Sequence, residues 1–486
     1  MEIKNDITKK IFKKAIFIFR RDLRVFDNIG LIQTLKSAEK VYPIFIFDPR
    51  QIDPSKNDYY SNRAARFMCN SLISLDQQIN KLNPNSNLNI LHGDYSSVVR
   101  SIIKETRADL LCVNMDYTPF STKRDKETKE ICEEHDIIFK DFEDICLLTK
   151  KQVEFENGIF PKIFSKFKKK ILNAEILKPD NSTFNNFSEK PIDSKYLVDI
   201  KNVHEFYSED LEENSILELK GGREEGLKLM ENIPELKNYD WVRRSPSQKT
   251  SRLSPHNKFG TVSIREVYWK AKDTLEENSD HFIRQLFCRD FYYYLGYYYP
   301  KIFEGPLHPK YEFLEWNENE DEYSSWKLGK TGIPIVDASM RKLNKTGNLS
   351  NRCRFIVSNF LVKQLNIDWR KGEKYFAKKL IDYDPCLNNG GWQWCAGCNS
   401  DYNPDFRIFD INKQSSTYDP EAEFIKKWVP ELEMVSKDDI HQWEENHTKY
   451  PQINYPAPLR IYSESKMNTI EIYKKAFEKF EQKLIN

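Results

Sequence analysis

The first part of the chain alternates between short apolar runs and longer stretches of mixed composition. Residues 15–19 and 41–47 are rich in β-branched and aromatic side chains and show no helical period, so they are predicted to be buried parallel strands. Further strands are expected at 88–91, 110–113 and 137–139, and helices at 28–40, 62–79 and 122–135. This alternation predicts a doubly wound, Rossmann-like α/β domain over residues 15–150.

The remainder of the chain is predicted to be a linker followed by helices. Residues 151–210 are rich in Lys, Asn, Ser and Pro and have weak periodicity, which indicates a linker lying over the surface. Residues 281–299 form a long aromatic helical pattern closed by Pro300. With further helices expected at 347–365, 371–381 and 470–484, residues 211–486 should form an all-α domain without a disordered signalling tail.

Composition narrows the class of protein. The chain has 486 residues, 39% apolar and 31% charged, and a formal net charge of +1. It should be globular, with two domains or more, and any basic DNA-binding surface must be confined to one face. No apolar run reaches the length of a membrane span, and residues 1–14 are too charged for a signal peptide. We therefore expect a soluble intracellular monomer, in the cytoplasm or the nucleus.

Nine cysteines without an even framework suggest reduced thiols. Cys395 and Cys398, with Cys386 and Cys353, could supply four thiolates to a zinc or iron–sulfur site. Their spacing matches no common metal framework, and the eight histidines are scattered. Free buried thiols, with no metal, are the favoured interpretation.

Residues 382–394 carry the most specific chemistry in the chain. They include two acids two positions apart, two adjacent amides, two glycines and two tryptophans, a composition that favours a turn over a helix or a strand. The acids and amides can hydrogen-bond the edge of a heteroaromatic ring, and the glycines let backbone approach a flat ligand. Tryptophan adds a stacking face and an indole for one-electron chemistry. A structural loop rarely combines these features.

This segment resembles the flavin-binding loop of the DNA photolyase and cryptochrome family. Matching motifs follow one order along residues 15–435, first at 19–24 with Asp27 and Asn28, then at 326–338, 368–373, 404–409 and 419–432. The resemblance is greatest to class I cyclobutane pyrimidine dimer (CPD) photolyases. It implies an α/β domain beside an antenna chromophore and a helical domain that binds FAD.

The resemblance implies which residues contact FAD. Asp382 and Asp384 would face the ribose and the isoalloxazine edge, and Arg354 is expected to pair with Asp382, since a carboxylate in a dry pocket needs a counter-charge. Asn388 matches the residue opposite flavin N5, where a neutral amide can hydrogen-bond the reduced ring without adding charge. Hydroxyls at 250–254 suit a diphosphate, although such clusters usually only cap helices. The other expected contacts are Tyr239, Thr250, Ser251, Arg252, Leu253, Ser254, Gln285, Arg289, Asn351 and Tyr383.

Three tryptophans match the family's electron relay: Trp392, Trp369 and Trp316. Indole is readily oxidised, and a chain of rings reaching the surface can refill a photoexcited oxidised flavin in short hops. Buried tryptophan is otherwise often core packing. The match at all three positions favours the relay.

The expected lesion pocket departs from the usual pattern. Repair requires a pocket that takes the damaged dinucleotide out of the duplex. CPD photolyases mostly have Glu at the position of Gln285, Trp at Cys288 and Met at Phe355. Losing a tryptophan wall costs about 1–3 kcal/mol of stacking, unless Phe287 or Tyr292 replaces it. Arg289, Asn351 and Trp394 complete the expected pocket, and the expected contacts to DNA backbone are Arg243, Arg352, Arg407 and Gln414.

These features predict light-driven repair of UV-damaged DNA, in which reduced FAD lends an electron to a flipped-out CPD and the dimer splits. A (6-4) photolyase is disfavoured, because Asn351 and Phe355 stand where its two histidines are usual. A cryptochrome photoreceptor is disfavoured by Asn388, although Cys288 is compatible with it. A nucleic-acid-binding module without chemistry explains neither the flavin loop nor the relay.

A second, antenna chromophore is expected at a crevice beside residues 114–119, near Arg124 and Asp125. A folate, a deazaflavin and a second flavin all remain open. No Gly-rich dinucleotide fingerprint follows the first strand, so this domain is not a nicotinamide-cofactor site. The preference for duplex or single-stranded DNA is also left open.

Overall fold

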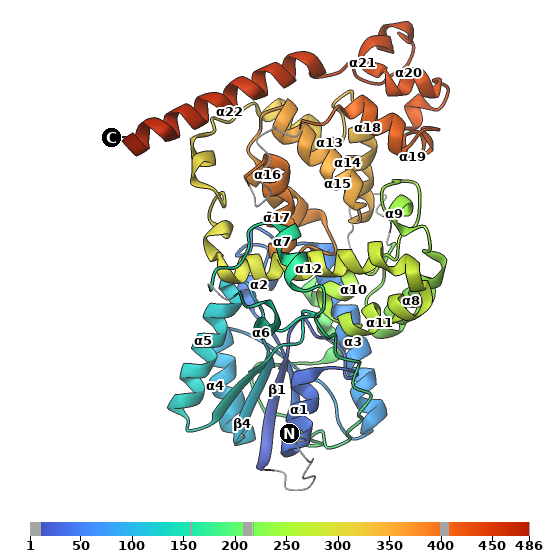
Figure 1. The fold of residues 1–486 in the computed structure, drawn as a ribbon. Coiled ribbons are helices and arrows are strands. Elements are labelled where there is room, and N and C mark those ends of the chain that lie inside the picture. Colours follow the sequence, from blue (N-terminus) through green and yellow to red (C-terminus); the bar gives the residue numbers. More distant parts are fainter. Residues whose placement is uncertain (1–10, 156–157, 208–215, 217, 399–407, 486) are drawn as a thin grey trace.

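A twisted sheet forms the centre of the amino-terminal part (Figure 1). The computed structural model describes residues 11–155, 158–207, 216, 218–398 and 408–485. Within them the strand order is β5-β4-β1-β2-β3-β6, and β6 alone runs antiparallel to its neighbour. The strands are β1 (Phe12–Phe19), β2 (Ala38–Phe47), β3 (Asn89–His92), β4 (Leu110–Asn114), β5 (Ile138–Phe142) and β6 (Leu197–Val198).

Helices cover both faces of this sheet (Figure 1). Side chains alternate along a strand, so Phe17 and Phe19 pack with helices α1 (Ile29–Ser37) and α3 (Asn62–Leu82). Ile16 and Ile18 pack on the other face with α4 (Tyr95–Thr106) and α5 (Pro119–Glu134). The predicted doubly wound domain is confirmed.

The carboxyl-terminal part is helical, as predicted, and lies above the sheet in Figure 1. The long aromatic helix α12 (Asp280–Tyr298) ends just before Pro300. Gly347 ends α14 in a left-handed conformation, so the helix expected from 347 starts only at α15. The other helices here are α8 (Arg223–Glu231), α9 (Tyr239–Val242), α10 (Ser254–Phe259), α11 (Ile264–Leu275), α13 (Glu320–Leu328), α14 (Pro334–Thr346), α15 (Asn351–Asn359), α16 (Trp369–Lys379), α17 (Pro385–Ala396), α18 (Ile411–Tyr418), α19 (Glu423–Trp428), α20 (Lys437–His441), α21 (Trp443–Asn446) and α22 (Tyr462–Ile485).

The segment expected to be a linker holds short elements of its own. Its described residues include α7 (Phe164–Lys170) and β6, which extends the sheet at β3. Phe187 is fully buried and forms a bridge to Val41 of β2. Two short helices, α2 (Pro49–Ile52) and α6 (Lys150–Val153), complete the amino-terminal half.

The turn predicted within 382–394 is wrong for residues 385–394, which belong to α17. Asp384 caps the helix by accepting a hydrogen bond from the Leu387 N–H, and Pro385 occupies the first turn, where its missing N–H costs nothing. Gly390 lets α12 approach closely, since a Cβ there would lie 2.3 Å from the Tyr292 ring. Capping and packing outweigh the low helix propensity of Asn and Gly.

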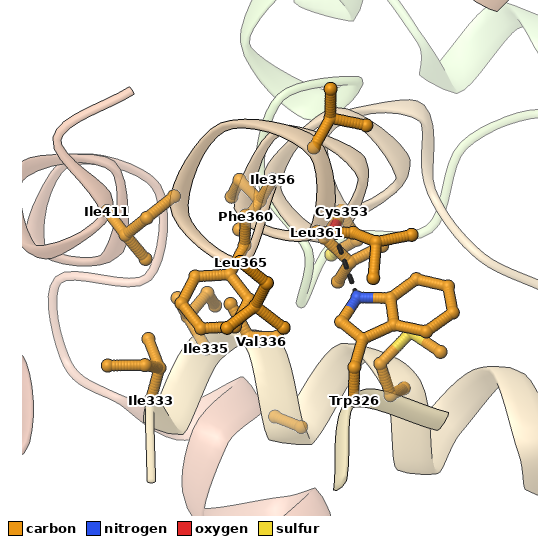
Figure 2. Packing of buried hydrophobic residues seen from close by; sticks show 14 of the residues in the cluster. Trp326, Ile333, Ile335, Val336, Cys353, Ile356, Phe360, Leu361, Leu365 and Ile411 are labelled. Atoms are coloured by element: carbon orange, nitrogen blue, oxygen red, sulfur yellow. Dashed lines mark hydrogen bonds between the residues drawn. The ribbon is translucent and has the colours of Figure 1, made fainter. Parts of the chain in front are cut away.

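A large apolar cluster joins α13 to α17 with the carboxyl-terminal helices. Figure 2 shows Trp326 of α13 against the side chains of α15, with its indole N–H donating to the Val357 carbonyl at 3.0 Å. Trp392 and Trp369 belong to the same cluster. This core fixes α15, α16 and α17, which carry much of the candidate site.

Candidate functional site

A cavity of about 670 Å³ lies among α9, α10, α12, α15 and α17. Most of the residues predicted for FAD or lesion binding line it, although they are far apart in sequence. They are Tyr239, Arg243, Thr250, Ser251, Arg252, Leu253, Ser254, Gln285, Cys288, Arg289, Tyr292, Asn351, Arg354, Phe355, Asp382, Tyr383, Asp384, Asn388, Trp392 and Trp394. The volume falls in the range of small-molecule and cofactor sites.

Four predicted residues do not line this cavity, and a fifth is outside the described residues. Trp369 is buried and Trp316 is half-buried, both in or against the cluster that contains Trp392. Arg352 donates to Gln414 Oε1 at 3.0 Å, so the structure brings these two predicted DNA contacts together. Arg407 lies outside the described residues.

Asp382 and Arg354 form the predicted ion pair. Arg354 Nη2 lies 2.8 Å from Asp382 Oδ2, and the carboxylate side chain is 8% exposed. The partner was predicted from the need of a dry carboxylate for a counter-charge, and this prediction is confirmed.

Asp384 is held by Arg21, a residue of the other half of the chain. Arg21 follows β1 and contacts both Asp384 and the Tyr293 hydroxyl, while its Nη1 lies 3.2 Å from Asp116 Oδ1. The Tyr293 hydroxyl also donates to Asp384 at 2.5 Å. Burial raises the pKa of Asp384, but the charges of Arg21 and Lys258 outweigh it and keep that pKa below its ordinary value. Asp384 is therefore ionised beside the cavity.

Asn388 is fixed by a buried acid that the sequence did not single out. Its Nδ2 donates to Glu373 Oε1 at 2.9 Å and to the Glu373 carbonyl at 3.1 Å. Burial raises the pKa of Glu373 to about 7, although hydrogen bonds from Asn388, Tyr383 and Tyr59 oppose the rise. Glu373 lies in the matched motif at 368–373, which was its only signal in the sequence.

We expect Glu373→Gln to remove a pH-dependent loss of stability. Because the pKa of Glu373 is higher in the folded than in the unfolded protein, its carboxyl contributes stability that is complete below the unfolded pKa of about 4.3. This stability is lost as the pH rises through the folded pKa of about 7. The free energy of unfolding of the variant, relative to wild type, should thus increase by roughly 1–3 kcal/mol between about pH 5 and about pH 8. Urea unfolding at both pH values measures this. Glu105→Gln, on the exposed face of α4, is the control. Parallel wild-type and Glu373→Gln curves would contradict the assignment.

The hydroxyl cluster at 250–254 does not serve as a helix cap. The N-cap of α10 is Leu253, which has no side-chain capping bond. Arg252 adopts a left-handed conformation, with φ of 55°, and its Nη2 lies 2.7 Å from Glu218 Oε2. These hydroxyls therefore do not cap α10, and they line the cavity instead.

Aromatic rings form one wall of the cavity. Phe355 and Trp394 lie with ring centroids 4.6 Å apart, and Tyr292 also lines the cavity. Phe287, the other candidate to replace the missing tryptophan at Cys288, is not among the lining residues and packs near Tyr268. Phe164 of α7 lines the cavity as well, a contribution that the linker interpretation missed.

Trp392 lies between the cavity and the apolar core. It lines the cavity, is 2% exposed, and its ring centroid is 5.0 Å from Phe376 and 6.1 Å from Trp326. These contacts fit core packing, and the position beside the cavity also fits the predicted relay. The relay stays a prediction.

The cysteines are free thiols, and eight of the nine are buried. In the described ranges no three His, Cys, Asp or Glu side chains group as metal ligands. No helix among the described residues is both long and apolar enough to cross a bilayer.

Comparison with known proteins yields two family models and close structural neighbours. Residues 15–183 match the model "DNA photolyase", and residues 282–475 match "FAD binding domain of DNA photolyase". A deoxyribodipyrimidine photo-lyase of Buchnera aphidicola is 33% identical, over 96% of this chain and 97% of its own length.

Solved structures also resemble nearly the whole chain. One is an archaeal photolyase from Sulfolobus tokodaii with two FAD molecules, with a TM-score of 0.84 and 38% identity over 95% of this chain and 100% of its own. Another is a cryptochrome from Synechocystis, with a TM-score of 0.87 and 27% identity over 96% of this chain and 100% of its own.

Proposed function

The chain belongs to the DNA photolyase family, and from this premise we propose that it uses light to split cyclobutane pyrimidine dimers in DNA. It is thus a deoxyribodipyrimidine photo-lyase with FAD as cofactor. The observation that carries the proposal is the cavity wall shared by cofactor and lesion residues: the paired acids of α17 and the rings of Phe355 and Trp394 line one space.

The lining residues fit FAD. The hydroxyls at 250–254, which do not cap α10, and the basic side chain of Arg252 suit a diphosphate. Asp382 can accept from ribose or ring-edge donors while its charge stays balanced by Arg354. Reduced FAD, when bound, supplies an electron on absorbing blue light and takes it back after the dimer has split.

Asn388 gives the ring a neutral partner. Because its Nδ2 is engaged by Glu373, its Oδ1 is the group that can accept a hydrogen bond from the cofactor. Glu373 thereby acts as a positioning residue. Below about pH 7 it is protonated and adds no charge beside the ring.

The same cavity can receive two fused pyrimidines. Phe355, Trp394 and Tyr292 offer stacking faces, and Gln285 can both donate to and accept from a thymine edge. The absence of histidine at Asn351 and Phe355 supports a CPD over a (6-4) photoproduct.

Parallel assays with the two lesions test the choice of substrate. The reduced protein is illuminated with oligonucleotides that carry one CPD or one (6-4) photoproduct, each in single-stranded and duplex form, and restored pyrimidines are measured by chromatography. Restoration of the CPD alone is the expected result. Restoration of the (6-4) photoproduct alone would contradict the proposal.

Cys288→Trp should strengthen binding of the lesion by about tenfold, because it adds a stacking face to the cavity wall, and one such face is worth about 1–3 kcal/mol. Fluorescence titration with CPD-containing oligonucleotide measures the gain, and undamaged oligonucleotide, whose affinity should not change, is the control. Equal changes for both would show that Cys288 does not face the lesion.

A cryptochrome-type photoreceptor is the second candidate. Cys288 in place of the usual tryptophan and the likeness to the Synechocystis cryptochrome favour it. It predicts bound FAD that responds to light without restoring either lesion.

We also propose an antenna chromophore beside residues 114–119, at the carboxyl end of β4. The Sulfolobus tokodaii photolyase carries two FAD molecules, which makes a second flavin one candidate beside a folate and a deazaflavin. Mass spectrometry of gently denatured protein distinguishes the three by mass.

A further inference from the structure

Helix α7, in the segment expected to be a linker, is fixed against α12 by aromatic packing. Phe167 is fully buried, with its ring centroid 5.6 Å from that of Phe291, and Phe164 lies 5.7 Å from the same ring. Two aromatic anchors on a seven-residue helix leave its opposite face to solvent. The helix is therefore held in one place on the surface of the helical part.

That place is the border of the cavity. Phe164, the first residue of α7, lines the cavity together with Cys288 and Gln285 of α12. The guanidinium of Arg284, another lining residue, lies 5.7 Å from the centre of the Phe164 ring. Phe164 thus adds an aromatic face on the side where Cys288 replaces a tryptophan.

The solvent face of α7 is strongly basic. Residues 158–178 hold six lysines and one acid, Glu175, whereas the whole chain has a net charge of only +1. Lys166, Lys168, Lys169 and Lys170 are exposed, and none forms an ion pair with a described residue. Four exposed lysines on so short a helix, with a single acid in the surrounding segment, mark a place where anions are favoured.

We propose that α7 binds the sugar–phosphate backbone of the strand that flanks the lesion, through Lys166, Lys168, Lys169 and Lys170. The inference rests on the proposed function and extends it. A helix of seven residues is about 10 Å long, and nucleotides of one strand are about 3.4 Å apart, so the helix spans about three phosphates of the strand that flanks the dimer.

Exposed apolar side chains near α7 also suit a lipid surface, and the test must distinguish this partner from DNA. Leu172 is 69% exposed and Leu177 is 57% exposed. DNA is favoured because α7 is part of the cavity wall through Phe164, so a strand whose dimer enters the cavity must pass beside it.

The test compares a short and a long substrate. Lys168→Ala, Lys169→Ala and Lys170→Ala are combined, and binding is measured by fluorescence anisotropy with a four-nucleotide CPD oligomer and with a CPD-containing duplex long enough to cross α7. The control combines Lys81→Ala, Lys104→Ala and Lys474→Ala, three exposed lysines that lie outside the cavity wall. A third variant carries Lys→Arg at 168, 169 and 170.

The α7 triple alanine variant should bind the long duplex at least about tenfold more weakly at low salt, with a salt dependence smaller by about two to three ion equivalents. The short oligomer should bind as before, and the arginine variant and the control should match wild type. Unchanged binding of the long duplex, or equal loss in the control, would overturn the proposal. Lost binding to anionic lipid vesicles with unchanged DNA binding would also overturn it. If the proposed function itself is wrong, wild type will show no preference for CPD-containing DNA of any length. This outcome is distinct from a failure of the α7 proposal alone.

Discussion

Replacing Arg21 with Gln should lower the free energy of unfolding by about 3–5 kcal/mol and abolish retention of FAD, because it removes the largest opposing charge from two buried carboxylates, Asp384 and Asp116. Arg21 bridges Asp384, which lines the cavity, to Asp116 at the carboxyl end of β4. It therefore connects the α/β part to the cofactor site.

The sign of the pH effect follows from the lowered pKa of Asp384. In the wild-type protein this carboxylate contributes stability above the unfolded value of about 3.9, and the contribution is lost as pH falls through the folded value. Without Arg21, Lys258 alone of these two cations opposes burial, the pKa of Asp384 rises, and acid unfolding should begin at higher pH.

Urea unfolding and the FAD absorbance per protein measure both effects of the Arg21→Gln change. Arg50→Gln is the matched control, because Arg50 also pairs with an aspartate, Asp48, but its side chain is 43% exposed. The control should lose less than about 1 kcal/mol. An Arg21→Gln protein that keeps its FAD and loses less than about 1 kcal/mol of unfolding free energy would refute the bridging role.

Trp392→Phe should slow the light-driven reduction of oxidised FAD by at least about tenfold, a barrier increase of about 1.4 kcal/mol. Phenylalanine is far harder to oxidise than indole, and of the three tryptophans predicted to form a relay, Trp392 lines the cavity. Repair by protein that has been reduced chemically beforehand does not draw on the relay and should stay within about twofold of wild type.

The measurement is the bleaching of oxidised-flavin absorbance under blue light with a thiol as reductant. Trp443→Phe is the control, since Trp443 is 2% exposed in the same apolar cluster but is not part of the cavity wall. It reproduces the loss of packing without touching the relay. Unchanged bleaching in Trp392→Phe, or equal slowing in Trp443→Phe, would leave the three tryptophans as core residues.

The fold was predictable where one local pattern determines one element. Continuous apolar runs buried on both faces gave β1 and β2, and Pro300 gave the end of α12. Strand β6 has two residues, too short for any pattern to predict it. Helix α17 was missed because its stability comes from the Asp384 cap and from Tyr292 packed over Gly390, which local propensity does not contain.

The candidate site was predictable where a buried charge needs an opposite charge beside it. The pair of Asp382 and Arg354 is the example. The same reasoning applied to Asp384 would have sought a second cation, and the motif at 19–24 contains Arg21. Glu373 and Phe164 had no such signal, because each reaches the site through packing between segments distant in sequence. The resemblance named most of the residues that line the cavity, and the structure supplied these additional contacts.

The most direct test of the central claim is a count of dimers split by reduced, FAD-loaded protein under blue light, with the redox state of the flavin recorded before and after. A light-driven repair enzyme should split many dimers per flavin and none in the dark, and its flavin should end as reduced as it began. Retained, light-responsive FAD with every dimer intact would contradict the central claim.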